Sequence, residues 1–208
     1  GILILNIFIY YEIDIGFYNF FKNFNNSLQN IYLKEFFQEI TVIGDSKWYF
    51  ILSLLSIAVC HLIIKYNYFN KCKNTIKVFK NFGLYLFLSL ICTGLLTQLL
   101  KHVIGRPRPN HASFDDAFEF KFFSLNSEFH SFPSGHTSTI FAVALVVIFF
   151  IPKLKYFLLL LAGIVAFSRV VIGVHFFTDV LGGIVISYLG VKIIKLLLDK
   201  HYPIKTFE

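Results

Sequence analysis

The stretch "SFPSGHTSTIFAVALVVIFFI", residues 131–151, changes from polar to apolar within a few positions. Its first eight residues include hydroxyl, proline, glycine and histidine side chains, and the remainder is an unbroken apolar run. A run without charges is hydrophobic on every side of a helix, which is typical of a membrane span. The stretch therefore predicts a membrane helix with a group of polar residues at its start.

The composition of the 208-residue chain places it among membrane proteins. Hydrophobic residues make up 56% and charged residues only 15%, proportions that do not suit a soluble core with a solvated surface. The net charge of +7 comes from short lysine tracts between apolar runs, so it does not indicate a nucleic-acid-binding face. The three cysteines lack metal-ligand spacing. We therefore expect an integral membrane protein without a nucleic-acid partner.

Five apolar stretches are long enough, or nearly so, to cross a bilayer, which takes about 20 residues. They are residues 47–66, 82–104, 135–151, 156–174 and 178–198. Residues 1–10 are too short, and we interpret them as the end of a truncated first membrane helix rather than a signal peptide. The pattern of residues 11–46 predicts interfacial amphipathic helices. The predicted fold class is an all-α polytopic membrane bundle of about six helices, forming one domain over residues 1–208.

The lysines orient this predicted bundle, because basic residues in short loops are retained on the cytoplasmic side. They concentrate in three segments, at residues 65–80, 153–155 and 195–205. The other connections then face outward: residues 11–46, 105–134 and 174–178. Arg106, Arg108 and Arg169 break the rule, so we expect an anionic partner beside them.

The first of three polar groups at the outer helix ends is "KHVIGRPRP", residues 101–109. Its two prolines end the helix and stiffen the exit, so that basic side chains project from a constrained backbone. Lys101 and Arg108 are its candidate anion ligands. Snorkelling of basic side chains to the interface is the alternative explanation.

The second group is the polar start of the helix near residue 135. Pro133 suits a first helical turn, and a helix start presents free N–H groups that favour an anion such as phosphate. His136 is placed to hold a proton and donate it. An ordinary cap formed by Ser131 or Ser134 is the alternative, but it leaves Gly135 and His136 unexplained.

The third group is "SRVVIGVHFFTD", residues 168–179. Arg169 lies within an apolar span, where an ionisable group is costly and indicates function. His175 and Asp179 are four residues apart, so on a helix they would share a face, and the carboxylate would hold one imidazole nitrogen protonated. This pair predicts a histidine nucleophile, with a structural His–Asp hydrogen bond as the alternative.

Together these groups bring basic residues, a helix start, two histidines and a carboxylate to one membrane face. This set of groups suits phosphoryl transfer without a metal ion. Lys101, Arg108 and Arg169 would supply the charge neutralisation that Mg²⁺ provides elsewhere. We therefore expect no metal site and no cofactor.

The spacing of these residues resembles the type 2 phosphatidic acid phosphatase (PAP2) superfamily. Three motifs carry the resemblance: Lys101 with Arg108 and Pro109, Pro133 to His136, and Ser168 and Arg169 with His175 and Asp179. The resemblance implies that His175 attacks phosphorus, Asp179 orients it, and His136 protonates the leaving oxygen. It further implies a set of ligands for the phosphate oxygens: Lys101, Arg108, Ser134, Gly135 and Arg169. Arg106 lies outside the motif positions.

A site at the membrane surface implies a lipid phosphate as substrate. Residues 105–139 are most similar to the bacterial branch that includes lipid A 1-phosphatases, which implies an inner-membrane protein with its site facing the periplasm. Undecaprenyl diphosphate phosphatase and phosphatidylglycerophosphate phosphatase are alternatives, as are a lipid phosphotransferase and a scaffold without activity. We expect the loop at residues 110–131, which includes His111 and His130, to shape the entrance. No sequence feature specifies an oligomeric state.

Overall fold

The computed structural model describes residues 2–25, 31–110, 119–202, 204 and 206. Within these ranges the regular structure is helical and contains no strand, which confirms the predicted all-α class. The described part of the chain contains seven α-helices: α1 (Ile2–Asn25), α2 (Ile31–Thr41), α3 (Ser46–Lys65), α4 (Lys73–Ile104), α5 (Gly135–Phe150), α6 (Lys155–Val171) and α7 (Phe177–Leu198).

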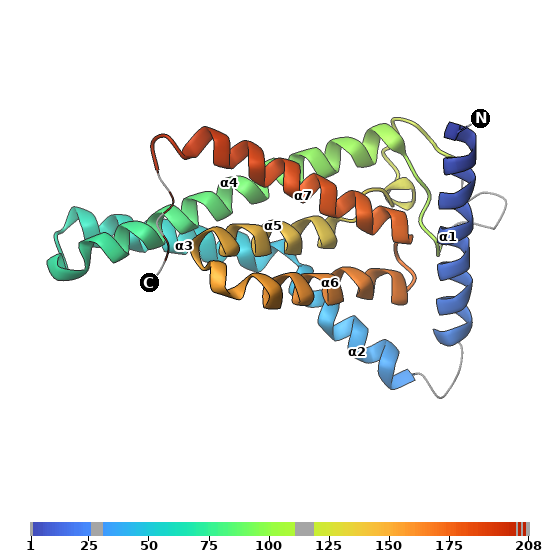
Figure 1. The fold of residues 1–208 in the computed structure, drawn as a ribbon, viewed down its shortest axis with the longest axis horizontal. Coiled ribbons are helices and arrows are strands. Elements are labelled where there is room, and N and C mark those ends of the chain that lie inside the picture. The colour runs from blue at the N-terminus through green and yellow to red at the C-terminus, as the bar shows by residue number, and fades with distance from the viewer. Residues whose placement is uncertain (1, 26–30, 111–118, 203, 205, 207–208) are drawn as a thin grey trace.

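Helices α3 to α7 form a bundle and run along its long axis (Figure 1). Helix α4 packs against α3, α5 and α7. The core between these helices contains fully buried large side chains, among them Tyr85, Val146 and Phe150. Helices α4 and α7 approach closely where Thr93 lies against Gly190. The absence of a Cβ at Gly190 permits this approach, because a Cβ there would collide with the threonine hydroxyl.

Four stretches of the described chain are long and apolar enough to cross a membrane: Ile31–Lys65, Lys73–Ile104, Pro152–Val171 and Phe177–Leu198. They contain four of the five predicted spans almost completely. Large apolar side chains such as Leu95, Phe157 and Leu196 are exposed on their outer faces, where lipid rather than water suits them. The protein is therefore a multi-pass membrane bundle.

Helix α5 begins and ends within one residue of the predicted stretch 135–151, but it is short for a membrane span. It contains 16 residues and is thus about 24 Å long at ~1.5 Å per residue, less than the roughly 30 Å hydrocarbon core. The helix ends at Phe150, because the residue before a proline disfavours helical geometry and Pro152 follows Ile151. Contacts with α4, α6 and α7 surround it, so its apolar side chains pack largely against protein.

Helix α1 differs from the prediction for the start of the chain. Residues 1–10 were expected to end a membrane helix that runs with the others. Instead, one continuous helix, Ile2–Asn25, lies across an end of the bundle (Figure 1). This helix covers the end where the predicted polar groups meet: the last turns of α4 and α6 and the first turns of α5 and α7. The turn between α3 and α4, which is rich in lysine, lies at the opposite end.

Candidate active site

Lys101 lies in the last turn of α4, just before the chain turns sharply. Gly105 adopts a left-handed conformation with φ of 59°, and a Cβ there would collide with the carbonyl of Lys121. Only glycine adopts this geometry without strain. The Nζ of Lys101, a buried side chain, donates to the carbonyl of His130 at 2.5 Å. Lys101 is thereby held in place beneath the loop that leads to α5.

The start of α5 carries no serine cap of the kind considered from the sequence. The Ser134 side chain makes no capping bond within the described chain; its Oγ instead accepts from the hydroxyl of Thr137 at 3.0 Å. The backbone N–H of Ser134 donates to the carbonyl of Asp179 at 3.0 Å, which ties α5 to α7. The first-turn N–H groups beginning at Gly135 are therefore not capped by a side chain, as an anion site at a helix start requires.

Arg169 lies in the last turn of α6 and is buried. Its Nη1 donates to the hydroxyl of Thr41 at 2.7 Å, while its Nε has no hydrogen-bond partner among the described residues. The backbone N–H groups of Val174 and His175 both fold back onto the Arg169 carbonyl, at 3.2 and 3.3 Å. This turn returns His175 to the backbone of the last turn of α6, and the charge of Arg169 acts on its imidazole.

The pairing of His175 with Asp179 is not the one expected from a shared helix face. Helix α7 begins at Phe177, so His175 lies before the helix and Asp179 lies in its first turn. The Asp179 carboxylate accepts the N–H of Phe176 at 2.8 Å, and the Nδ1 of His175 lies 3.5 Å from the same oxygen. The prediction of proximity holds, but a capped helix start produces it. The distance is at the long limit of a hydrogen bond, as is common in catalytic pairs without bound substrate.

The surroundings of His175 keep its imidazole neutral. Burial lowers the pKa of His175 to about 3, and the positive charges of Lys101 and Arg169 act in the same direction, whereas Asp179 opposes the change. A neutral imidazole with its Nδ1 beside a carboxylate leaves Nε2 available as a nucleophile.

Asp179 is fully buried and accepts several hydrogen bonds. Besides the Phe176 N–H, its carboxylate accepts the hydroxyl of Ser131 at 2.5 Å and Nη1 of Arg106 at 2.7 Å. From the sequence, Ser131 was expected only as an alternative helix cap, and Arg106 lies outside the motif positions. Both residues belong to the network around Asp179.

Arg106 forms ion pairs with two buried carboxylates, one of which comes from α1. Its Nη2 lies 2.8 Å from Asp14 and its Nη1 2.7 Å from Asp179, and the guanidinium carbon lies 4.2 Å from the centre of the Phe176 ring. Burial alone would lower the pKa of Arg106, but the two carboxylates raise it above its usual value. Removing one partner from a buried ion pair typically costs about 3–5 kcal/mol. Asp14 is a site residue that was not predicted from the sequence.

Three basic side chains converge on His136. The charges of Arg169, Lys101 and Arg108 all act on its imidazole. Arg108 is half-buried, and its Nε donates to the carbonyl of Ser127 at 3.1 Å; burial lowers its pKa, with partial compensation by Asp179. Because Lys101 and Arg169 also act on His175, the two histidines border one positively charged site.

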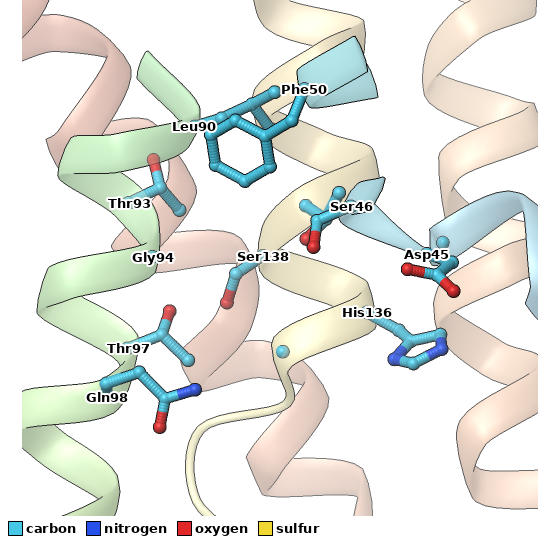
Figure 2. Close-up of a pocket in the computed structure, with 13 residues that line it drawn as sticks. Asp45, Ser46, Phe50, Leu90, Thr93, Gly94, Thr97, Gln98, His136 and Ser138 are labelled. Carbon is cyan, nitrogen blue, oxygen red and sulfur yellow. The ribbon is translucent and has the colours of Figure 1, made fainter. Parts of the chain in front are cut away.

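A cavity of about 320 Å³ extends from His136 toward the middle of the bundle, between α3, α4 and α5. Figure 2 shows Phe50 and Leu90 at its inner end and Thr97 and His136 toward the outer end. The hydroxyls of Thr93 and Thr97 are buried and have no hydrogen-bond partner in the described chain. Both hydroxyl oxygens lie within the protein, that of Thr93 against Gly190 of α7, whereas Asp45 and Gln98 contribute polar side chains to the cavity lining. A largely apolar cavity with a few polar side chains is suited to a ligand that carries both kinds of group.

The other histidines at this end have structural surroundings. The rings of His102 and His130 lie 4.4 Å apart, and the Nε2 of His130 lies 2.9 Å from the carbonyl of Ser124. His130 therefore fixes the loop and, through its carbonyl, Lys101. His111, expected near the entrance, lies outside the described residues.

These observations define a class: a helical membrane protein with a positively charged, histidine-containing pocket at one end of the bundle, next to an inner cavity. Residues 82–203 match the PAP2 superfamily, and the chain belongs to this family.

Similar proteins of known function include lipid phosphatases. The chain is 32% identical over 73% of its length to a lipid A 1-phosphatase of Rhizobium etli, and 33% identical over 70% to one of Rhizobium johnstonii, covering 66% and 59% of those proteins. It is 35% identical over 54% of its length to phosphatidylglycerophosphatase B of Bacillus subtilis, covering 56% of it. The chain thus spans between about half and two thirds of the length of these curated relatives.

Two crystal structures have a similar fold. One is that of Aquifex aeolicus LpxE, with a TM-score of 0.53 and 21% identity over 85% of this chain and 92% of that one. The other is that of the first transmembrane PAP2 type phosphatidylglycerolphosphate phosphatase from Bacillus subtilis, with a TM-score of 0.56 and 24% identity over 95% of this chain and all (100%) of that one. At these identities the two structures support the fold.

Proposed function

We propose that the protein is a lipid phosphate phosphatase that forms a phosphohistidine without a metal ion, with lipid A 1-phosphate as its substrate. The observation that carries the proposal is that the charges of Lys101 and Arg169 act on both histidines, and that of Arg108 on His136, at one end of an apolar bundle. Three positive charges are able to neutralise a phosphoryl group as it is transferred.

His175 attacks phosphorus through Nε2, because its Nδ1 faces Asp179. A nitrogen–phosphorus bond forms while the bond from phosphorus to the lipid oxygen breaks, and His136 donates a proton to that oxygen. Water then attacks the phosphohistidine, passes a proton to His136, and releases inorganic phosphate. The first-turn N–H groups beginning at Gly135, with Ser134, hold the phosphate oxygens during both steps.

The cavity beside His136 receives the alcohol that leaves. Since His136 protonates the leaving oxygen, the group attached to this oxygen lies on the same side of the site. The polar side chains of Asp45 and Gln98 in the cavity lining suit the sugar hydroxyl and amide groups of lipid A, or the glycerol ester of a phospholipid. In a polyprenyl diphosphate the leaving group is a polyprenyl monophosphate, and its charged phosphate would enter the cavity beside the carboxylate of Asp45, which is unfavourable.

The proposed location is the bacterial inner membrane, with the site facing the periplasm. The distribution of lysines supports this orientation, because the lysine-rich turn between α3 and α4 lies at the end of the bundle away from the site (Figure 1). Basic segments of this kind are retained in the cytoplasm.

A substrate panel tests the proposal. We expect purified protein in mixed micelles to release phosphate from lipid A faster than from phosphatidylglycerophosphate, undecaprenyl diphosphate or phosphatidic acid, at the same rate with EDTA as with Mg²⁺, because basic side chains supply the positive charge. Preference for another lipid would mean that lipid A is not the main substrate. Transfer of the phosphate to an acceptor lipid would indicate a transferase. Inactivity on every lipid would overturn the proposal. A requirement for Mg²⁺ would contradict the metal-free site.

Arg169→Lys should lower kcat/KM for phosphate release by about 100-fold, because one ammonium group cannot replace a two-pronged guanidinium donor. The Nε of Arg169 is buried without a partner and is therefore available to a phosphate oxygen. Steady-state kinetics in micelles would measure the effect. Lys47→Gln is the control, since it removes an exposed positive charge near the same end. Unchanged kinetics for Arg169→Lys would contradict phosphate binding by this residue.

A further inference from the structure

We infer that Asp14 of α1 is a positioning residue for the proposed reaction and acts through Arg106 and Thr178 on Asp179. The inference rests on the proposed function, because it assigns α1 to the same site. Asp14 is 1% exposed, although it lies in a helix across the end of the bundle and far in sequence from the motif residues. A buried carboxylate at such a position requires partners.

Each oxygen of Asp14 accepts hydrogen bonds from the site. Oδ2 accepts Nη2 of Arg106 at 2.8 Å and the hydroxyl of Thr178 at 2.5 Å. Oδ1 accepts the backbone N–H of Thr178 at 2.9 Å. Thr178 directly precedes Asp179, so Asp14 fixes the turn of α7 that carries the proposed orienting carboxylate.

Aromatic side chains on the following turn of α1 reinforce this contact. The Phe17 ring stacks on Phe177 with centroids 4.9 Å apart, and the Tyr18 ring lies 6.3 Å from that of Phe176. Helix α1 thus contacts three consecutive residues, 176–178, which are the residues between His175 and Asp179. A shift of this short segment would move the two side chains relative to each other.

The charges explain why the contact affects chemistry as well as packing. Arg106 is shared between Asp14 and Asp179, so the three side chains together carry one net negative charge. Without the charge of Asp14, Arg106 would be paired with Asp179 alone, and the negative potential at His175 would weaken. In a buried site such a change is poorly screened. Asp14 therefore keeps Asp179 a strong acceptor for the imidazole.

Asp14→Asn tests this role, with Glu12→Gln as the matched control because Glu12 is an exposed carboxylate on the same helix. We expect Asp14→Asn to lower kcat by about 10- to 100-fold with little change in KM, as small misplacements of catalytic groups do. Glu12→Gln should leave both constants unchanged. Equal kinetics for the two variants, or an effect on KM alone, would overturn the inference.

The background Arg106→Gln separates positioning from simple helix docking. In that variant two buried carboxylates are left without their shared positive charge, and adding Asp14→Asn restores the original net charge of the cluster. Asp14→Asn should therefore lower kcat in the wild type and raise it in the Arg106→Gln background, measured on the folded fraction. A further loss in the double variant would contradict the charge argument.

Amide hydrogen exchange distinguishes failure of this inference from failure of the proposed function. The N–H of Thr178 donates to Asp14, so its exchange should be faster in Asp14→Asn than in Glu12→Gln, whatever lipid the protein acts on. Faster exchange in a protein inactive on every lipid would overturn the proposed function but retain the contact of α1 with α7. Equal exchange in the two variants would overturn the inference itself.

Discussion

Replacing His175 with alanine should lower the rate of phosphate release from the preferred lipid by at least about 10⁴-fold, as deletion of a covalent nucleophile does elsewhere. The imidazole is buried and neutral, lies beside a carboxylate, and borders a site with three positive charges. No other described residue combines these properties. A single-turnover experiment with ³²P-labelled lipid would measure both the rate and the acid-labile phosphohistidine, which we expect to be present in the wild type and lost in the variant.

The pH dependence provides a second expectation for His175. Its pKa of about 3 means that the nucleophile stays unprotonated between about pH 5 and 8, the range in which an ordinary histidine changes charge. A loss of activity below about pH 6.5 in the pH–rate profile therefore cannot arise from protonation of this residue.

The control for His175→Ala is His61→Ala, at an exposed position on α3, which should retain full activity. An active His175→Ala variant that still forms an acid-labile adduct would show that another residue attacks phosphorus.

The sequence was sufficient for the class of fold because membrane spans are a local property. Apolar length, charge exclusion and prolines located all five apolar helices, four of which are long enough to cross a membrane, and the lysines indicated which helix ends lie together. The sequence predicted α5 to within one residue, but it did not predict the direction of α1. That direction depends on which neighbours cover an apolar helix, and hydropathy does not report this.

Most of the site was predictable for a different reason. Lys101, Arg108 and Arg169 lie at positions where basic residues are unexpected; the charges of Lys101 and Arg169 act on both histidines, and that of Arg108 acts on His136. The spacing of His175 and Asp179 predicted their proximity, although through a helix face rather than the start of a capped helix. A separation of four residues is compatible with both geometries.

The second carboxylate at the site was not predictable from spacing. Asp14 lies 92 positions before Arg106, so no local pattern connects them. The available signal was the residue itself, a carboxylate among isoleucines in "EIDIG", because an ionisable group in an apolar helix usually has a buried partner. Residues 11–46 were predicted to form interfacial helices, in which an exposed carboxylate is expected, so Asp14 was not recognised as a buried residue.

Asp179→Asn should lower kcat by about 10³- to 10⁴-fold while the protein stays folded. The carboxylate accepts Arg106 on one oxygen, and Ser131 and the Phe176 N–H on the other. An amide has one accepting oxygen, so its NH₂ group must face either Arg106 or the donors on the side of His175. In the second orientation the NH₂ group would favour the imidazole tautomer with Nδ1 unprotonated and Nε2 protonated, which cannot attack phosphorus.

The ion pair with Asp14 separates this catalytic loss from unfolding. When Asp179 loses its charge, Arg106 still has Asp14 at 2.8 Å, so no buried charge is left without a partner and the penalty for breaking an ion pair is largely avoided. Thermal unfolding in detergent should therefore change much less than kcat. Asp199→Asn, an exposed position directly after α7, controls for loss of a carboxylate. If Asp179→Asn retained kcat within about threefold of the wild type, the carboxylate would not orient the nucleophile; if it unfolded, Asp14 would not suffice to hold the Arg106 guanidinium.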